Sequence, residues 1–269
     1  MADAGSLARG TVGRTRVTSL VKTQRSGPMA TLVLNRPERH NSLVPELLEE
    51  LRGSLRAAGS DPSVRAVVLA AEGRSFSMGG DVRGFFSAPD LPAYASQTVG
   101  LLNDVILEML RLPQPIVAAV HGSVTGGSLG LVLGADLVLV SPNVTFTPWY
   151  SVVGFSPDGG WTAMLPELIG AKRTAALVFE NGSISASQAV EWGLATEMVP
   201  GDEIEERAAT LAMEIASMRP GAISGAKRLL AADIADIAVR LEAERAAFLE
   251  QVVTAEARKG MAAFLGRSR

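Results

Sequence analysis

Two adjacent glycines, Gly126 and Gly127, stand where a buried strand is expected to turn into a helix. The apolar run 116–120, which follows Pro115, predicts the strand, and the small residues after the glycines predict the helix. The first N–H groups of a helix have no partner within it, and a residue without Cβ lets a ligand oxygen approach them. The pair could therefore bind an anion or oxyanion, or could simply allow close packing of strand and helix.

A second glycine-bearing turn follows another buried strand upstream. The apolar run 67–71 precedes the turn 77–81, S-M-G-G-D, which contains Met78 and Gly80 and closes at Asp81. Two strand ends that both present backbone donors could converge on one carbonyl oxygen, as an oxyanion hole requires. Neither turn indicates such a site by itself.

Asp158, in S-P-D-G-G-W, is a candidate for proton transfer. In an apolar cleft the pKa of a carboxyl group rises, and the group could then move a proton between two carbon atoms. The same sequence, ahead of Met164 and Leu165, is also suitable for capping a helix N-terminus. The residues alone leave both interpretations open.

Three of the five Trp and Tyr residues of the chain lie near Asp158, namely Trp149, Tyr150 and Trp161. They indicate either an aromatic-walled pocket for a cyclic or aryl group, or packing in the core or at a subunit interface. The Tyr150 phenol could orient water or substrate as a hydrogen-bond donor.

Composition excludes several classes of protein. The net charge of -3 gives no support for nucleic-acid binding. The absence of cysteine excludes disulfides, thiolate metal sites and a cysteine nucleophile, and two histidines, His40 and His121, make a multi-histidine metal centre an unsuitable interpretation. The most apolar region, 116–140, is interrupted by polar residues and glycines, so we expect no membrane partner and a cytoplasmic location.

The rest of the pattern predicts an α/β protein whose strands and helices position these residues. Expected strands are 17–22, 29–34, 67–71, 116–120, 137–140 and 194–199. Residues 82–94 read as irregular, and Ser42 and Ser185 are candidate helix caps. Expected helices begin near Pro45 and span 97–112, 162–170, 171–180, 204–218, 222–232 and 234–258.

Several motifs occur in an order and at a spacing that resemble the crotonase superfamily, also called the enoyl-CoA hydratase/isomerase family. They are L-N-R-P-E-R-H-N-S-L at 34–43, the two glycine turns, and S-P-D-G-G at 156–160. The resemblance implies a crotonase-like ββα spiral core over 17–200 and a C-terminal helical trimerisation region over 201–269, after a disordered N-terminal lead over 1–16. It also implies an acyl-CoA thioester as substrate, with coenzyme A part of that substrate and no further cofactor or metal, and a homotrimer or dimer of trimers.

The resemblance assigns roles within an active site, although one scaffold in this superfamily performs several reactions. The amides of Gly80 and Gly127 would hold the thioester oxygen, with Met78 the alternative donor in the first turn. Hydratases of the family use two glutamates, and the matching positions, Gly130 and Tyr150, hold no carboxylate. Family members that isomerise double bonds can place their carboxylate where this chain has Asp158.

The implied activity is therefore a double-bond isomerase with a single carboxylate. The alternatives are a hydratase, a hydrolase or retro-Claisen enzyme, and a non-catalytic acyl-CoA-binding protein. The implied substrate contacts, including a late phenylalanine and a basic residue for the adenine or phosphates, are Ser42, Arg39, Asp81, Trp149, Trp161, Lys227, Phe264 and Arg267.

Overall fold

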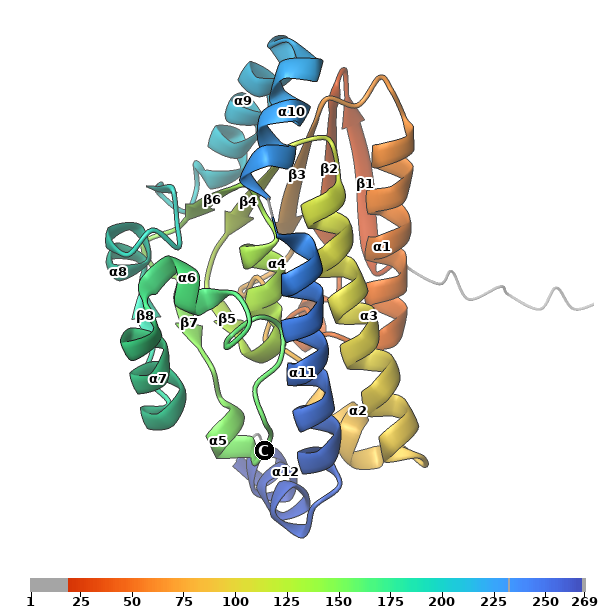
Figure 1. The fold of residues 1–269 in the computed structure, drawn as a ribbon, viewed down its shortest axis with the longest axis vertical. Coiled ribbons are helices and arrows are strands. Elements are labelled where there is room, and N and C mark those ends of the chain that lie inside the picture. The colour runs from red at the N-terminus through yellow and green to blue at the C-terminus, as the bar shows by residue number, and fades with distance from the viewer. Residues whose placement is uncertain (1–18, 232, 268–269) are drawn as a thin grey trace, which may run out of the picture.

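The computed structural model describes residues 19–231 and 233–267, of which Arg267 is described by its backbone alone, and its centre is a mixed β-sheet. Within the described residues, six strands have the order β1-β2-β3-β4-β6-β9 (Figure 1). The strands are β1 Val21–Ser26, β2 Met29–Leu34, β3 Ala66–Ala71, β4 Ile116–Val120, β6 Leu137–Val140 and β9 Glu197–Met198. Only the β1–β2 pair is antiparallel, and every residue of β3 and β4 is buried, as expected of parallel strands covered on both faces.

Helices cover both faces of this sheet, and alternate strand residues face different cores. On one face lie α1 Pro45–Ser60 and α3 Leu91–Arg111, with α11 Ile234–Val252 packed against α3 (Figure 1). On the opposite face α9 Ile204–Ser217 packs on β2, β3, β4 and β6. The sheet is therefore a rigid platform whose strand ends carry the two glycine turns.

A small second sheet carries the Gly126–Gly127 turn. It consists of β5 Ser123–Thr125, β7 Thr145–Thr147 and β8 Ile184–Ser185. The turn is the short helix η2 Gly126–Ser128, which continues into α4 Leu129–Leu133. The expected direct passage from β4 to the glycines is thus interrupted by one extra strand, β5.

The remaining short helices connect these layers and close one end of the molecule. They are η1 Pro37–Arg39, α2 Val82–Ser87, α5 Tyr150–Val153, α6 Leu165–Ile169, α7 Ala171–Glu180, α8 Ala186–Glu191, α10 Pro220–Leu230 and α12 Ala255–Arg267. The C-terminal α12 packs against α2 and α5, which lie far from it in sequence (Figure 1). No helix in the described ranges combines the length and apolar composition needed to cross a bilayer.

Some predicted boundaries were wrong because caps act locally. The expected irregular segment 82–94 contains α2 and the start of α3, whose N-termini are capped by the carboxylates of Asp81 and Asp90. Ser185 caps α8 as predicted, whereas the residue before α1 is Val44 rather than Ser42. The strand predicted over 17–22 begins at Val21 and extends to Ser26.

Other differences lie at the ends of the chain. The helix predicted over 234–258 divides into α11 and α12, and the helix predicted over 162–170 is only the short α6. The predicted N-terminal lead lies outside the described residues. The homotrimer or dimer of trimers and the cytoplasmic location stay predictions.

Candidate active site

The two glycine turns open into one apolar cavity of about 70 Å³. Besides the turns, its lining includes Asp158, Trp149 and Tyr150, together with apolar side chains from α2, α3, α5, α11 and α12. Three aromatic rings from separate segments, Phe85, Phe155 and Phe248, pack on one another with centroids 5.1–5.7 Å apart. The cavity therefore suits an apolar group held next to a few polar ones.

The two turns touch each other through their backbones. Gly79 has φ +73°, and a Cβ there would lie 2.7 Å from the carbonyl oxygen of Thr125, so only glycine fits. Ser128 joins the turns, because its hydroxyl accepts a hydrogen bond from the Gly79 N–H at 2.8 Å. The sequence prediction that the turns converge is confirmed in this respect.

Gly80 and Gly127 both line the cavity, and among the described residues neither N–H group donates a hydrogen bond to another backbone group outside the helices and strands. By contrast, the Met78 N–H donates to the His40 carbonyl oxygen at 3.0 Å. Of the two candidates in the first turn, the geometry therefore favours Gly80 as an oxyanion donor, and Met78 contributes only to the lining.

Asp158 lies against the second turn, buried to 7 % exposure. Its Oδ1 accepts a hydrogen bond from the Tyr150 hydroxyl at 2.6 Å, and that hydroxyl is also 2.8 Å from the Asp158 main-chain oxygen. A Cβ on Gly127 would come within 2.8 Å of Oδ1, so the carboxylate touches the candidate oxyanion turn. Tyr150 is the first residue of α5, which lies next to α12 at one end of the molecule (Figure 1).

Burial raises the pKa of Asp158 from 3.8 to about 7. The Tyr150 hydrogen bond lowers this pKa, and the negative charge of Glu244 raises it. Burial and the Asp158 charge also raise the pKa of Tyr150 well above its usual value, so the phenol keeps its proton. Asp158 is consequently the group in this cavity that can gain or lose a proton near neutral pH.

The alternative role of Asp158 as a helix cap is wrong. The N-cap of α6 is Met164, and the backbone hydrogen bond that lowers the pKa of the Asp158 carboxyl comes from the N–H group of Asp158 itself and not from a helix that follows it. The N–H groups of Gly160, Thr162 and Ala163 donate instead to Glu244, on α11. No sequence motif marked Glu244, which lies more than 80 positions away from this turn.

The aromatic residues near Asp158 divide into two groups. Trp149 lines the cavity, with its ring centroid 5.9 Å from that of Phe264, which also lines it. Trp161 does not, and its prediction as a pocket wall was wrong, because its ring is fully buried behind the turn. Its Nε1 donates to the Gly126 carbonyl oxygen at 2.8 Å, and its ring packs edge-on to Tyr150. Trp161 thus supports the site from behind.

The position that holds a glutamate in the hydratases is closed in this structure. Gly130 is buried in α4, and a Cβ there would overlap the Ile106 side chain and lie 2.9 Å from the Gly159 carbonyl oxygen. A side chain at 130 would therefore require the Ile106 side chain to change its position and the Gly159 carbonyl group to shift.

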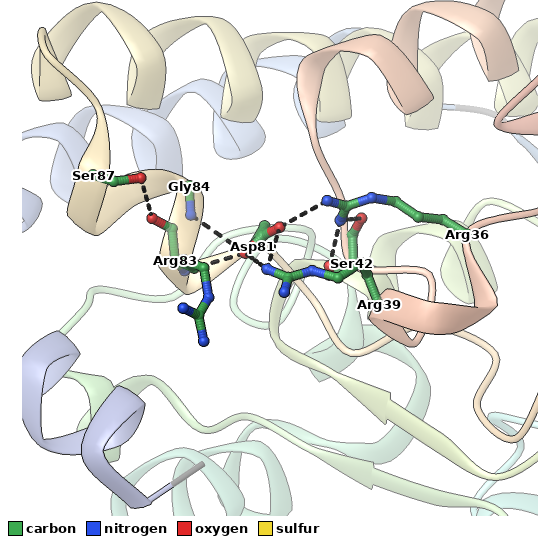
Figure 2. A network of polar contacts seen from close by, with 7 residues as sticks. All are labelled: Arg36, Arg39, Ser42, Asp81, Arg83, Gly84 and Ser87. Carbon is green, nitrogen blue, oxygen red and sulfur yellow. Dashed lines mark hydrogen bonds and ion pairs between the residues drawn. The ribbon is translucent and has the colours of Figure 1, made fainter. Parts of the chain in front are cut away.

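A network of charged residues lies around Asp81, directly after the first glycine turn (Figure 2). Arg36 donates to Asp81 at 3.0 Å and to the Ser42 hydroxyl at 2.7 Å, and Arg39 contacts both Asp81 oxygens at 3.2 Å. Asp81 also accepts from the backbone of Arg83 and Gly84 at the start of α2. Burial alone would raise the pKa of Asp81, but the two guanidinium groups outweigh it and lower the pKa.

This network modifies the predicted contacts. Arg39, Ser42 and Asp81 line a surface groove that shares Met78, Gly80, Val82 and Phe264 with the cavity. Asp81 already accepts hydrogen bonds from Arg36, Arg39 and two backbone N–H groups, so it orders the groove, and its role as a substrate contact stays a prediction. Arg36 is the more buried of the two arginine partners of Asp81.

Lys227 was predicted wrongly as a contact for phosphate. Its ammonium group is buried at 6 % exposure, pairs with Asp136 at 2.7 Å, and donates to the carbonyl oxygens of Met109 and Gln114. Burial lowers its pKa, and Asp136 opposes that effect. Lys227 therefore fixes α10 to the segment before β4, away from the cavity lining. The side chain of Arg267 lies outside the described residues.

The histidines take no part in the cavity lining. His121 Nε2 donates to the Gly73 carbonyl oxygen at 2.9 Å, which is a structural contact outside the cavity lining. Across the described residues, no three His, Asp or Glu side chains gather in an arrangement that could hold a metal ion.

Comparisons with known proteins agree with this architecture. A family model described as Enoyl-CoA hydratase/isomerase matches residues 24–269. The chain belongs to this family. Its resemblance to the crotonase superfamily, and the corresponding fold with a C-terminal helical region, are confirmed.

Individual relatives carry names of different reactions. A probable enoyl-CoA hydratase, EchA12 of Mycobacterium tuberculosis H37Rv, is 35% identical over 236 residues, covering 84% of this chain and 82% of that protein. The 1,2-epoxyphenylacetyl-CoA isomerase of Escherichia coli K12 is 30% identical over 240 residues, covering 88% and 92%. The crystal structure of an enoyl-CoA hydratase from Bacillus halodurans superposes with a TM-score of 0.85 at 25% identity, covering 91% of this chain and 100% of that one. Membership therefore identifies an acyl-CoA enzyme family without choosing the reaction.

Proposed function

We propose that this family member is an acyl-CoA isomerase that moves a carbon–carbon double bond with Asp158 as its single proton carrier. The observation that carries the proposal is the position of Asp158, a buried carboxyl group with a pKa of about 7 that touches Gly127. A proton carrier between two carbons must both take and release its proton, and a pKa near the working pH serves both steps.

The proposed reaction begins when the thioester oxygen accepts hydrogen bonds from the N–H groups of Gly80 and Gly127. The Asp158 carboxylate removes a proton from the α carbon of a 3-enoyl thioester, and the electron pair spreads through the double bond onto the thioester oxygen. Asp158 then returns the same proton to the γ carbon, which leaves a 2-enoyl thioester. Loss of one oxyanion donor typically raises such a barrier by about 3 to 4 kcal/mol.

Tyr150 supports Asp158 in both halves of this cycle. Its hydroxyl lies within hydrogen-bond distance of two Asp158 oxygens but has one proton to donate. It donates to Oδ1 while Asp158 is ionised, and to the main-chain oxygen while Oδ1 carries the proton and donates to the phenol. Asp158 therefore keeps a partner in each protonation state.

The lining of the cavity favours a cyclic or aryl acyl group as the substrate. Its wall of packed phenylalanine rings offers apolar, flat surfaces, and aromatic groups pack favourably on such rings. The Escherichia coli relative, named for a phenylacetyl derivative, favours the same choice.

Hydration is the second candidate, because the Mycobacterium tuberculosis relative is named a probable enoyl-CoA hydratase. The closed position at Gly130 and the phenol at Tyr150 argue against it, since hydration needs an acid and a base that both reach the water. Asp158 alone would have to perform both roles.

The test is mass spectrometry of products formed in heavy water from 2-enoyl, 3-enoyl and cyclic or aryl acyl-CoA thioesters. Isomerisation predicts a product with the elemental formula of the substrate and a shifted chromatographic retention. It carries deuterium at carbon only in the turnovers in which the Asp158 carboxyl exchanges its proton with solvent before returning it. A product heavier by one water would establish hydration, a cleaved thioester or carbon–carbon bond would establish a hydrolase, and binding without turnover would establish a non-catalytic protein. Each of the last three results would refute the proposal.

A further inference from the structure

Glu244 on α11 is a buried carboxylate that the proposed reaction does not use directly. Its side chain is 5 % exposed, and no ion pair to it is recorded within the described residues. Oε2 accepts from the Gly160 N–H at 2.8 Å. Oε1 accepts from the N–H and hydroxyl of Thr162 at 2.6 and 2.7 Å and from the Ala163 N–H at 2.9 Å. Four donors from one turn therefore satisfy a charge that would otherwise be costly to bury.

We propose that Glu244 is a positioning residue for Asp158, which fixes the turn 159–163 and thereby holds the Asp158 carboxylate against Gly127. This inference rests on the proposed role of Asp158. Through Glu244, α11 of the C-terminal helical region would set the position of Asp158 in addition to packing against α3.

The backbone of the turn explains why its position matters. Gly159 and Gly160 have φ values of +64° and +90°, and a Cβ on Gly159 would overlap the Gly127 carbonyl group. The residue after Asp158 is thus in backbone contact with the second oxyanion turn. Any displacement of this turn would move Asp158 relative to Gly127, and misplacement by about 1 Å can reduce turnover about 100-fold.

The charge of Glu244 has a second effect on the same group. Because two negative charges repel, Glu244 raises the pKa of Asp158, in addition to the larger effect of burial. The other polar group that faces Asp158 is the Tyr150 phenol of α5, whose hydrogen bond lowers this pKa. A cation also contacts the turn: Arg240 donates to the Ala163 carbonyl oxygen and pairs with Glu167 and Asp236.

A purely structural role for Glu244 makes a different prediction. If the side chain only stabilised the turn, removing its charge would lower resistance to unfolding and leave the titration of Asp158 unchanged. If it positions Asp158 and tunes its proton affinity, removal of the charge alters that titration in the folded protein.

The experiment follows the carboxyl band of Asp158 by infrared spectroscopy of the full chain, labelled with carbon-13 aspartate, between pH 5 and 9. Subtraction of the Asp158→Asn spectrum identifies the band. We expect a midpoint near 7 in the parent protein and a midpoint about one pH unit lower in Glu244→Gln, because one like charge is removed. The matched control is Glu242→Gln, an exposed residue on the same helix that pairs with Arg245, and its midpoint should equal that of the parent.

An unchanged midpoint in folded Glu244→Gln would overturn the proposal. If that variant does not fold, Glu244→Asp keeps the charge but has a shorter arm that cannot reach all four donors. It should lower kcat about 10-fold or more with little change in KM, and an unchanged kcat would overturn the proposal. The infrared titration does not depend on turnover, so a shifted midpoint in a protein without isomerase activity would refute the proposed function alone.

Discussion

Replacement of Asp158 by asparagine should make the protein more stable above neutral pH while abolishing isomerisation. The folded structure raises the pKa of Asp158 from 3.8 to about 7. A shift of this size corresponds to about 4 kcal/mol, because each pKa unit is about 1.4 kcal/mol. Asparagine carries no charge at any pH and can still accept the Tyr150 hydrogen bond through its side-chain oxygen.

The direction of the effect follows from where the proton binds more tightly. Below about pH 4 Asp158 is protonated in both states, so its ionisation costs no stability. As pH rises from 4 to 7, the unfolded chain releases this proton while the folded protein retains it, and stability falls until the folded group also ionises. Between pH 5 and 8 the free energy of unfolding of Asp158→Asn, relative to the parent, should therefore rise by about 2.5 kcal/mol.

Urea unfolding of both proteins at several pH values measures this difference, and other titrating groups cancel between them. The exposed Asp202 offers the matched control, since Asp202→Asn makes the same chemical change at the surface and should show no such trend. A constant difference between Asp158→Asn and the parent from pH 5 to 8 would refute the raised pKa, and with it the reasoning for Asp158 as a proton carrier near neutral pH.

Three further substitutions test separate parts of the site. Tyr150→Phe removes the hydrogen bond that lowers the pKa of Asp158. The acid limb of the pH profile of kcat/KM should therefore move to higher pH, and a shift to lower pH would contradict this. Gly127→Ala places a Cβ 2.8 Å from Asp158 Oδ1 and should lower kcat about 100-fold, whereas Gly225→Ala, which meets no atom within 4 Å, should leave kcat unchanged. Lys227→Ala removes the ion pair of Asp136 and should lower the free energy of unfolding, measured with urea, by about 3 kcal/mol. The affinity for acyl-CoA should not change. Weaker acyl-CoA binding by the folded variant would instead support Lys227 as a phosphate contact.

The sequence was sufficient for those parts of the site whose signals are local. Glycines after buried strands at 79–80 and 126–127 indicated turns with free N–H groups, and these turns indeed meet at one cavity. The strands and most long helices followed from apolar periodicity, because a buried parallel strand or an amphipathic helix has a recognisable pattern within a few residues.

The predictions were wrong where the hydrogen-bond or ion-pair partners of a side chain lie far away in sequence. Lys227 resembled a solvated helix charge, and only the fold brings Asp136 and two carbonyl groups to it. Trp161 was predicted as part of the cavity wall, yet it packs behind the turn because Gly126 offers its carbonyl group there. Glu244 was overlooked for the same reason, since its four donors belong to a turn more than 80 positions earlier.

The aromatic wall links the proton affinity of Asp158 to the choice of reaction. Burial is the main cause of the raised pKa, and the lining of the cavity around Asp158 is mostly apolar. A hydratase must admit water beside its acid and base, and that water would solvate the carboxylate and lower its pKa towards the usual range. The apolar rings of Phe85, Phe155 and Phe248 in the cavity wall are therefore more compatible with the proposed function, in which the Asp158 carboxyl group returns its proton to carbon, than with activation of water. The closed position at Gly130 acts in the same direction, because a side chain there, as a second carboxylate would need, meets Ile106 and the Gly159 carbonyl oxygen.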